Sequence, residues 1–198
     1  MNLIFRRTGN RRYSVEAQRP GFPNLEMNPA PGYDPLIPHD LMHLVVEAQL
    51  GLTHAIYGQL AAGGTAGTFR LIVKSDESSR KISRARHRVN ARGKKMLSKA
   101  REECLQSERA TYICWQAWLD RSASPERRKT AQTMADQAKQ VRGVADATEL
   151  QALNQRKLDE ICKHLDQLGS HWSSLEIGQS MTVHWPDLAI VTEPAAED

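Results

Sequence analysis

A long helical pattern in the second half of the chain limits the fold more than any other feature. From Ser78 to about Leu168, apolar residues recur at intervals of three or four, which is typical of amphipathic helices. Breaks are predicted at Ser122–Pro125, where a serine cap precedes a proline, and near Gly143, and the last helix is expected to end at Gly169. A chain of 198 residues with such a segment is too short for a large α/β barrel.

Strand patterns stand on both sides of the helical segment. Short runs rich in β-branched and aromatic residues occur at Leu3–Thr8, Arg12–Gln18, Thr68–Lys74 and Ser180–Trp185, and a further short strand is expected at Asn24–Met27. Gly9–Asn10 joins the first two runs as a hairpin turn does, whereas the three prolines in Asn28–Pro35 predict irregular structure. We therefore predict an α+β fold with a small antiparallel sheet built from both termini, a short buried helix that carries a histidine pair, and a long antiparallel helical arm.

This pattern divides the chain into three predicted parts. Residues 1–77 are expected to form an α+β core with the histidine-bearing helix, and residues 78–168 the helical arm. Residues 169–198 are expected to return to the core sheet and to end in a frayed tail. The long helices are also a candidate interface for a homo-oligomer.

The composition bears on where the protein is located and on the state of its cysteines. The sequence has no run of 18 apolar residues, and its short apolar start is followed at once by Arg6 and Arg7, so we expect no membrane span, no secretory signal and a cytoplasmic protein. Cys104, Cys114 and Cys162 are an odd number without a C-x-x-C spacing. They are therefore expected to be reduced thiols in the core.

The segment that carries the histidine pair is unusual in its charge. Residues 31–69 contain no Lys or Arg, although average usage in this chain would place about five there. Within this segment a helix is predicted to begin at Pro35 or at Pro38 and to end at Gly51. His39 and His43 stand four residues apart on that helix, a spacing that offers two ligands to one divalent metal. The predicted cofactor is a divalent metal, with zinc as the first choice.

Further ligands and a catalytic base are sought nearby. Glu47 lies about 12 Å along the helix axis from His39, so it would join His43, orient an imidazole or hold a second ion. His54 is the nearest further imidazole, and His171 and His184 are more distant candidates. In a metal-dependent hydrolase the ion would activate water, and Asp40 or Glu47 would be the base.

Two other interpretations of the pair remain open. The helix is apolar nearly all round, so the histidines can be core residues that are hydrogen-bonded to loop carbonyls, with Asp40 complementing the helix amino terminus. Alternatively, His and Glu can act as a metal-free acid and base.

Two resemblances attach to these residues. The segment from Pro31-Gly32-Tyr33-Asp34 through residues 38–43 to residues 58–64 resembles a group of uncharacterised bacterial proteins, which implies no activity. The His-Asp-x-x-His pattern of residues 39–43 is similar to the zinc motif of the ubiquinone-biosynthesis decarboxylase family, whose next ligand is a Glu at the position of Ala55. In the zincin metalloproteases, His-Glu-x-x-His, the general-base Glu stands where this chain has Asp40.

A second feature points to a different class of function. Residues 80–101, which we call the basic stretch, contain ten cations and no acid, and Arg80, Arg84, Arg88 and Arg92 form a row at intervals of four. Such a row is typical of contacts with phosphates, so the alternative function is a non-enzymatic scaffold that binds nucleic acid or an acidic protein partner. The simpler interpretation is a solvated face, or one that docks on the acidic carboxy-terminal helices.

Overall fold

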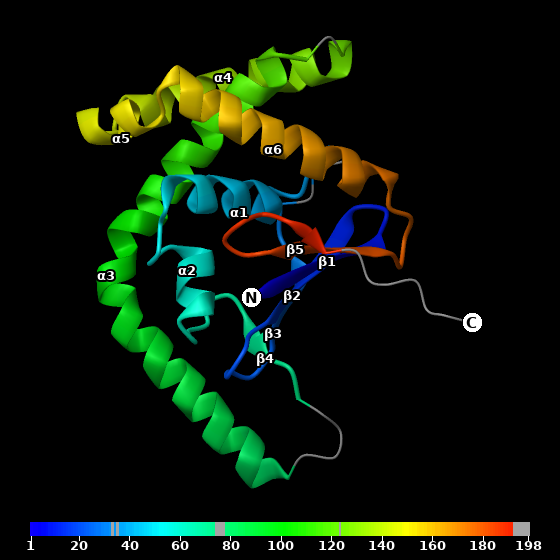
Figure 1. Cartoon of the computed structure of the whole chain (residues 1–198), viewed down its shortest axis with the longest axis vertical. Helices are drawn as coiled ribbons and strands as arrows, with labels where there is room; N and C mark the ends of the chain where they lie inside the picture. Colours follow the sequence, from blue (N-terminus) through cyan, green and yellow to red (C-terminus); the bar gives the residue numbers. More distant parts are fainter. Residues whose placement is uncertain (33, 35, 74–77, 123, 192–198) are drawn as a thin grey trace.

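Both ends of the chain meet in one antiparallel sheet (Figure 1). The computed structural model describes residues 1–32, 34, 36–73, 78–122 and 124–191, without the side chains of residues 97–99. The strands follow the order β4-β3-β2-β1-β5-β6, with the bounds β1 Asn2–Gly9, β2 Arg12–Gln18, β3 Leu25–Ala30, β4 Arg70–Leu71, β5 Ser180–His184 and β6 Ile190–Val191. In β1, Leu3 lies opposite Ala17 of β2 and Val183 of β5. The predicted α+β fold is confirmed.

The third and fourth strands differ from their predicted bounds. β3 continues to Ala30, so the expectation of irregular structure over Asn28–Pro35 was wrong for residues 28–30. Val15 pairs with Met27 and Tyr13 pairs with Ala30, which leaves Asn28 and Pro29 at a register shift in the ladder. A proline is tolerated at such a bulge because no ladder hydrogen bond is required of it. β4 is much shorter than its predicted run, whose last residue, Lys74, lies outside the described residues.

The helix α1 (His39–Leu50) lies between the sheet and α6 (Gln155–Ser174), with α3 (Ser79–Asp120) along its side (Figure 1). Pro38 stands at its amino-terminal cap, and Gly51 ends it in the left-handed conformation with φ of 67°. Pro35, the other predicted start, lies outside the described residues. Because neighbours surround α1, residues 40–47 are all buried. Its polar side chains must therefore find partners inside the protein.

The helical part of the chain consists of α3, α4 (Pro125–Arg142), α5 (Ala147–Ala152) and α6. α3 is one continuous helix of 42 residues, which makes it about 63 Å long. The predicted breaks are confirmed, because Ser124 caps α4 and Gly143 follows its last residue. α2 (Ile56–Ala61) fills the space between α3 and the sheet (Figure 1).

The helix α6 continues past its predicted end to Ser174. A Cβ atom at Gly169 would lie 3.3 Å from the carbonyl oxygen of Leu36 and 3.4 Å from the ring of Trp118. Gly169 therefore serves close helix packing within α6 and does not terminate it. One turn later, the buried Trp172 packs edge-on against Tyr13 of the sheet, with ring centroids 5.9 Å apart.

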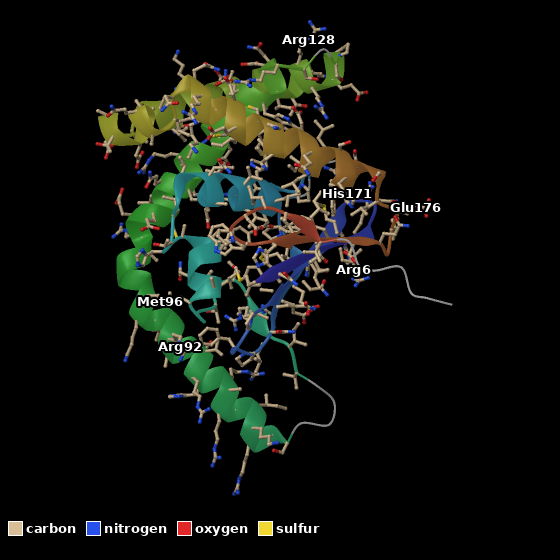
Figure 2. The ribbon with its side chains drawn as sticks, viewed as in Figure 1. Arg6, Arg92, Met96, Arg128, His171 and Glu176 are labelled. Carbon is tan, nitrogen blue, oxygen red and sulfur yellow. The ribbon has the colours of Figure 1, made fainter. Side chains whose placement is uncertain are left out.

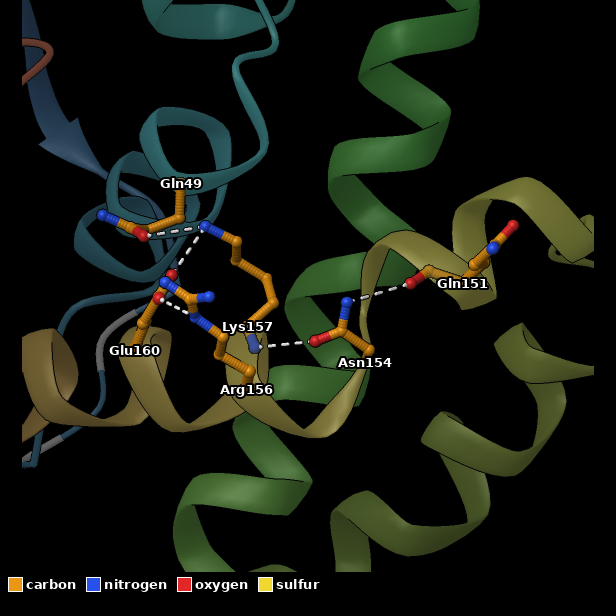
Figure 3. A network of polar contacts seen from close by, with 6 residues as sticks. All are labelled: Gln49, Gln151, Asn154, Arg156, Lys157 and Glu160. Atoms are coloured by element: carbon orange, nitrogen blue, oxygen red, sulfur yellow. Dashed lines mark hydrogen bonds and ion pairs between the residues drawn. The ribbon is translucent and has the colours of Figure 1, made fainter.

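The start of α6 is held by a polar network (Figure 3). Asn154 caps the helix, since its Oδ1 accepts a hydrogen bond from the backbone N–H of Lys157 at 3.1 Å. The Nζ of Lys157 donates to Gln49 of α1 at 3.4 Å and to Glu160 at 2.8 Å. Lys157 therefore links α6 to α1.

We expect Asn154→Ala to lower the free energy of unfolding by about 1 kcal/mol, because the first turn of α6 loses its cap. Urea denaturation followed by circular dichroism measures the change. Asn154→Ser, which retains a capping oxygen, is the matched control and should stay close to the parent. Equal losses in both variants would show that the cap does not stabilise this helix end.

The sheet, α1, α3 and α6 contribute to one buried apolar cluster. Cys114 and Cys162 are buried free thiols, and Cys104 is a partly buried one. The division of the chain into residues 1–77, 78–168 and 169–198 stays a prediction, and the tail expected to fray, residues 193–198, lies outside the described residues.

Candidate metal centre

The two histidines of α1 lie together at its amino-terminal end, where the helix faces α3. The ring centroids of His39 and His43 are 4.5 Å apart, and the ring planes are nearly perpendicular. His43 is 1 % exposed, and His39 is partly buried. The rings of Tyr112 and Trp115 of α3 lie 6.3 and 6.0 Å from the ring of His39 and bound the site on that side.

Glu108 of α3 completes the cluster. Its Oε2 lies 3.7 Å from Nε2 of His43, and one ligand atom from each of His39, His43 and Glu108 falls within 4.8 Å of the others. About half of the Glu108 side chain is exposed. The site therefore combines two imidazoles inside the protein with a carboxylate at its surface.

Both Nε2 atoms in this cluster are buried and have no hydrogen-bond partner among the described residues. A buried polar atom without a partner is costly, and native proteins satisfy most of them. Here Nε2 of His43 lies 3.7 Å from the Glu108 carboxylate, and a ring nitrogen of His39 lies within 4.8 Å of both. A cation bound between them would satisfy all three groups, and the donor set of two imidazoles and a carboxylate fits a divalent transition metal.

The other nitrogen of His43 is held by residues behind it. Nδ1 of His43 lies 2.8 Å from Oγ of Ser107, and that hydroxyl donates to Oε1 of Glu47 at 2.9 Å. Since Ser107 donates to Glu47, it accepts from Nδ1–H of His43. This arrangement fixes the tautomer in which the lone pair is on Nε2. Thr111 adds a second hydroxyl 3.3 Å from Nδ1.

The imidazoles of the cluster are neutral at neutral pH. Burial, with a further contribution from His39, lowers the pKa of His43 to about 3. Burial also lowers the pKa of His39 below its ordinary value. The neutral imidazole is the form that ligates a metal.

Glu47, a predicted ligand or base, serves a different purpose. Its carboxyl oxygens accept from the backbone N–H groups of Ile56 at 3.3 Å and Tyr57 at 2.8 Å, the first two residues of α2. Burial raises the pKa of Glu47 to about 8. Glu47 therefore caps α2, whose first residue is Ile56.

Asp40, the other predicted base, is bound from the side of the sheet. The hydroxyl of Tyr13 donates to its carboxylate, and the hydroxyl of Tyr57 donates to its backbone oxygen at 2.6 Å. Burial raises the pKa of Asp40 to about 6. Its carboxylate is not in the cluster formed by His39, His43 and Glu108.

His54, the third predicted ligand, pairs with α3 at a separate place. Its Nδ1 lies 2.9 Å from Oε1 of Glu103, and its backbone N–H donates to Oε2 of the same residue at 2.6 Å. Among the predicted site residues, the structure thus brings together His39 and His43, and it adds Glu108. Glu108 follows His43 by 65 positions, and no spacing rule connects them.

The basic stretch is not near this site. Arg80, Arg84, Arg88 and Arg92 are exposed on the amino-terminal half of α3, at the opposite end of that helix from α4, α5 and α6 (Figure 1). The interpretation that this face docks on the acidic carboxy-terminal helices is therefore wrong for these four arginines.

Comparisons with known proteins leave the function to be argued from the residues themselves. Neither protein-family models, nor curated proteins, nor solved structures match this chain. None of the helices in the described ranges is long and apolar enough to cross a membrane.

Proposed function

We propose that this protein binds one divalent transition metal, zinc in the first place, through His39, His43 and Glu108. The observation that carries the proposal is the pair of buried Nε2 atoms without hydrogen-bond partners beside the Glu108 carboxylate. The interpretation as ordinary core histidines accounts less well for the site, because it requires these atoms to be paired with protein groups.

The donor geometry is compatible with zinc. Zinc–nitrogen bonds of about 2.0–2.1 Å in a tetrahedron place ligand atoms about 3.4 Å from one another. Nε2 of His43 and Oε2 of Glu108 are already 3.7 Å apart. All three ligand atoms lie within 4.8 Å of one another, and the half-exposed side chain of Glu108 can change rotamer to shorten its own distances. Three protein ligands would leave a fourth position for water, as in catalytic zinc sites.

A metal-dependent hydrolase is the reaction class that this donor set supports. A bound ion would polarise water and lower its pKa to about 7. Asp40 and Glu47, the bases expected from the sequence, are engaged by Tyr13 and by the start of α2. In our proposal they therefore do not take the proton. The Glu108 side chain is about half exposed, so this proposed ligand is in contact with solvent.

Elemental analysis tests the proposal directly. Protein purified without a histidine tag or chelator should carry about one zinc, manganese or iron ion per chain, and chelator-treated protein should regain about one on addition of zinc. A parent protein that holds no ion and takes up none would refute the proposal. The histidines would then be interpreted as ordinary core residues.

Ser107 gives a finer test of how His43 is oriented. Ser107→Ala removes the acceptor of Nδ1–H, so we expect the zinc affinity to fall by about 10- to 100-fold while the stoichiometry stays the same. Competition with a chromophoric chelator measures the affinity. Ser107→Thr should restore most of it, and Ser173→Ala, at an exposed position of α6, should leave it unchanged. An unaltered affinity in Ser107→Ala would remove Ser107 from the site.

Self-association through the helical arm stays a prediction, because a single chain does not test it. Binding of nucleic acid by the basic stretch would involve none of the three proposed metal ligands.

A further inference from the structure

The described cations of the basic stretch are exposed and have no acidic partners. Every Lys and Arg in it is exposed to solvent, apart from Lys99, whose side chain lies outside the described residues. None of the others forms an ion pair within the described part of the chain. The ion-paired cations nearest along the sequence are Arg109 of α3 and Arg121, which follows α3. Figure 2 shows the nitrogen-tipped side chains projecting from the free end of α3. The protein itself therefore leaves this charge unneutralised.

The apolar side of the same stretch is turned toward the body of the protein. Val89 is 4 % exposed, and Gly93 is buried where α3 passes Thr65. Met96 packs one turn further on, close to Gly64, and Figure 2 shows it on the same part of α3 as Arg92. With its apolar side covered in this way, α3 fixes the direction in which its cations face.

A groove adjoins the row of arginines. It has a volume of about 500 Å³ and lies between α3 and the turn at Gly21–Pro23, where Phe22, Arg88, Arg92 and Lys95 line it. The guanidinium of Arg92 stacks on the ring of Phe22, with its carbon 4.7 Å from the ring centroid. The basic stretch has no aromatic residue of its own, and the fold supplies one from the loop between β2 and β3.

A buried cation lies behind the groove. Arg19 is 4 % exposed, and its guanidinium donates to the carbonyl oxygens of Pro23, Leu60 and Gly64. Burial, with the nearby charge of Arg92, lowers the pKa of Arg19 to about 10, so it remains a cation at neutral pH. A buried charge that meets only carbonyl dipoles keeps its attraction for an anion outside.

We propose that the row Arg80, Arg84, Arg88 and Arg92, together with the groove at Phe22, binds the phosphodiester backbone of a nucleic acid. The row rises by about 6 Å per step and spans about 18 Å, the length of about five phosphates along one strand of a duplex. The stacked guanidinium and phenyl planes offer a surface for an unpaired base. A helix that lies on a membrane would instead need an apolar face exposed along its length, and here that face packs on the protein from Val89 to Met96.

The test is fluorescence anisotropy with labelled probes of about 20 nucleotides: single-stranded RNA, single-stranded DNA and duplex DNA. We expect binding at about 50 mM salt that weakens steeply toward about 200 mM. Arg80→Glu/Arg84→Glu/Arg88→Glu should weaken binding by about tenfold or more and reduce the salt slope by about 2 to 3. The matched control, Lys129→Glu/Lys139→Glu/Arg142→Glu, makes the same charge change at exposed positions of α4 and should weaken binding by less than about threefold.

Each outcome decides the proposal. Absence of binding to all three probes at low salt would overturn it, as would an equal loss in the α4 control, which would assign the affinity to net charge alone. Binding to phosphatidylserine vesicles or to an acidic polypeptide, without binding to any probe, would also overturn it. Phe22→Ala distinguishes base contacts from phosphate contacts. If the affinity falls only for the single-stranded probes, an unpaired base stacks at the groove. If the affinity for all three probes is unchanged, the protein contacts only the phosphates.

Discussion

His39→Ala/His43→Ala is expected to lose zinc and the stabilisation that zinc provides. At a zinc concentration about 100 times the dissociation constant, the parent should gain about 2.7 kcal/mol in free energy of unfolding. For a chain of this size that gain corresponds to a rise in melting temperature of roughly 5 to 10 °C. The variant should show no rise, because two of the three ligand side chains are gone. Thermal denaturation with and without zinc measures both proteins.

The control removes the same number of imidazoles elsewhere. His54→Ala/His171→Ala alters a histidine paired with Glu103 and an exposed one on α6, and it should keep both the bound ion and the rise in melting temperature. If this control lost the ion and the α1 variant kept it, the ligand set proposed here would be wrong. Neither variant should change the affinity for nucleic acid, since the basic stretch is intact in both.

Trp118→Ala should produce the largest loss of stability among single substitutions at the helix contacts. The Trp118 side chain is 2 % exposed, its Nε1 donates to Asp166 of α6 at 2.8 Å, and Arg127 of α4 lies over its ring. Removing a buried tryptophan leaves a cavity and costs about 3 to 5 kcal/mol. The midpoint of urea denaturation should fall accordingly.

Trp118→Phe is the conservative comparison. It keeps an aromatic ring at this position but removes the hydrogen bond to Asp166 and the distal ring atoms that lie near Gly169, so we expect a loss of about 1 to 2 kcal/mol. A Trp118→Ala variant as stable as Trp118→Phe would mean that α6 does not pack on α3 through this residue.

The sequence predicts those elements whose signals are local. The hairpin follows from alternation around Gly9–Asn10, and the end of α1 follows from Gly51. The errors occur where a distant neighbour decides. Pro29 stays in a strand because the ladder to β2 is shifted beside it, and Gly169 stays in a helix because Trp118 packs against it.

The candidate site likewise has one contact that is local in the sequence and others that depend on a distant helix. The contact between His39 and His43 follows from one helical turn, and the sequence predicts it. Glu108 and Ser107 reach the pair only because α3 crosses α1, and no pattern in the sequence specifies where two helices cross. For Glu47 the sequence predicts the correct face of α1 but not the role. Its carboxyl oxygens accept hydrogen bonds from the N–H groups at the start of α2.

The β4 margin of the sheet bears on how copies of this protein can meet. Among the described residues, β4 has two residues, and the part of β3 beyond it contains a bulge and Pro29. Short margins, bulges and prolines are devices by which proteins prevent strands of different molecules from pairing. Addition of a foreign strand is therefore discouraged at this side of the sheet.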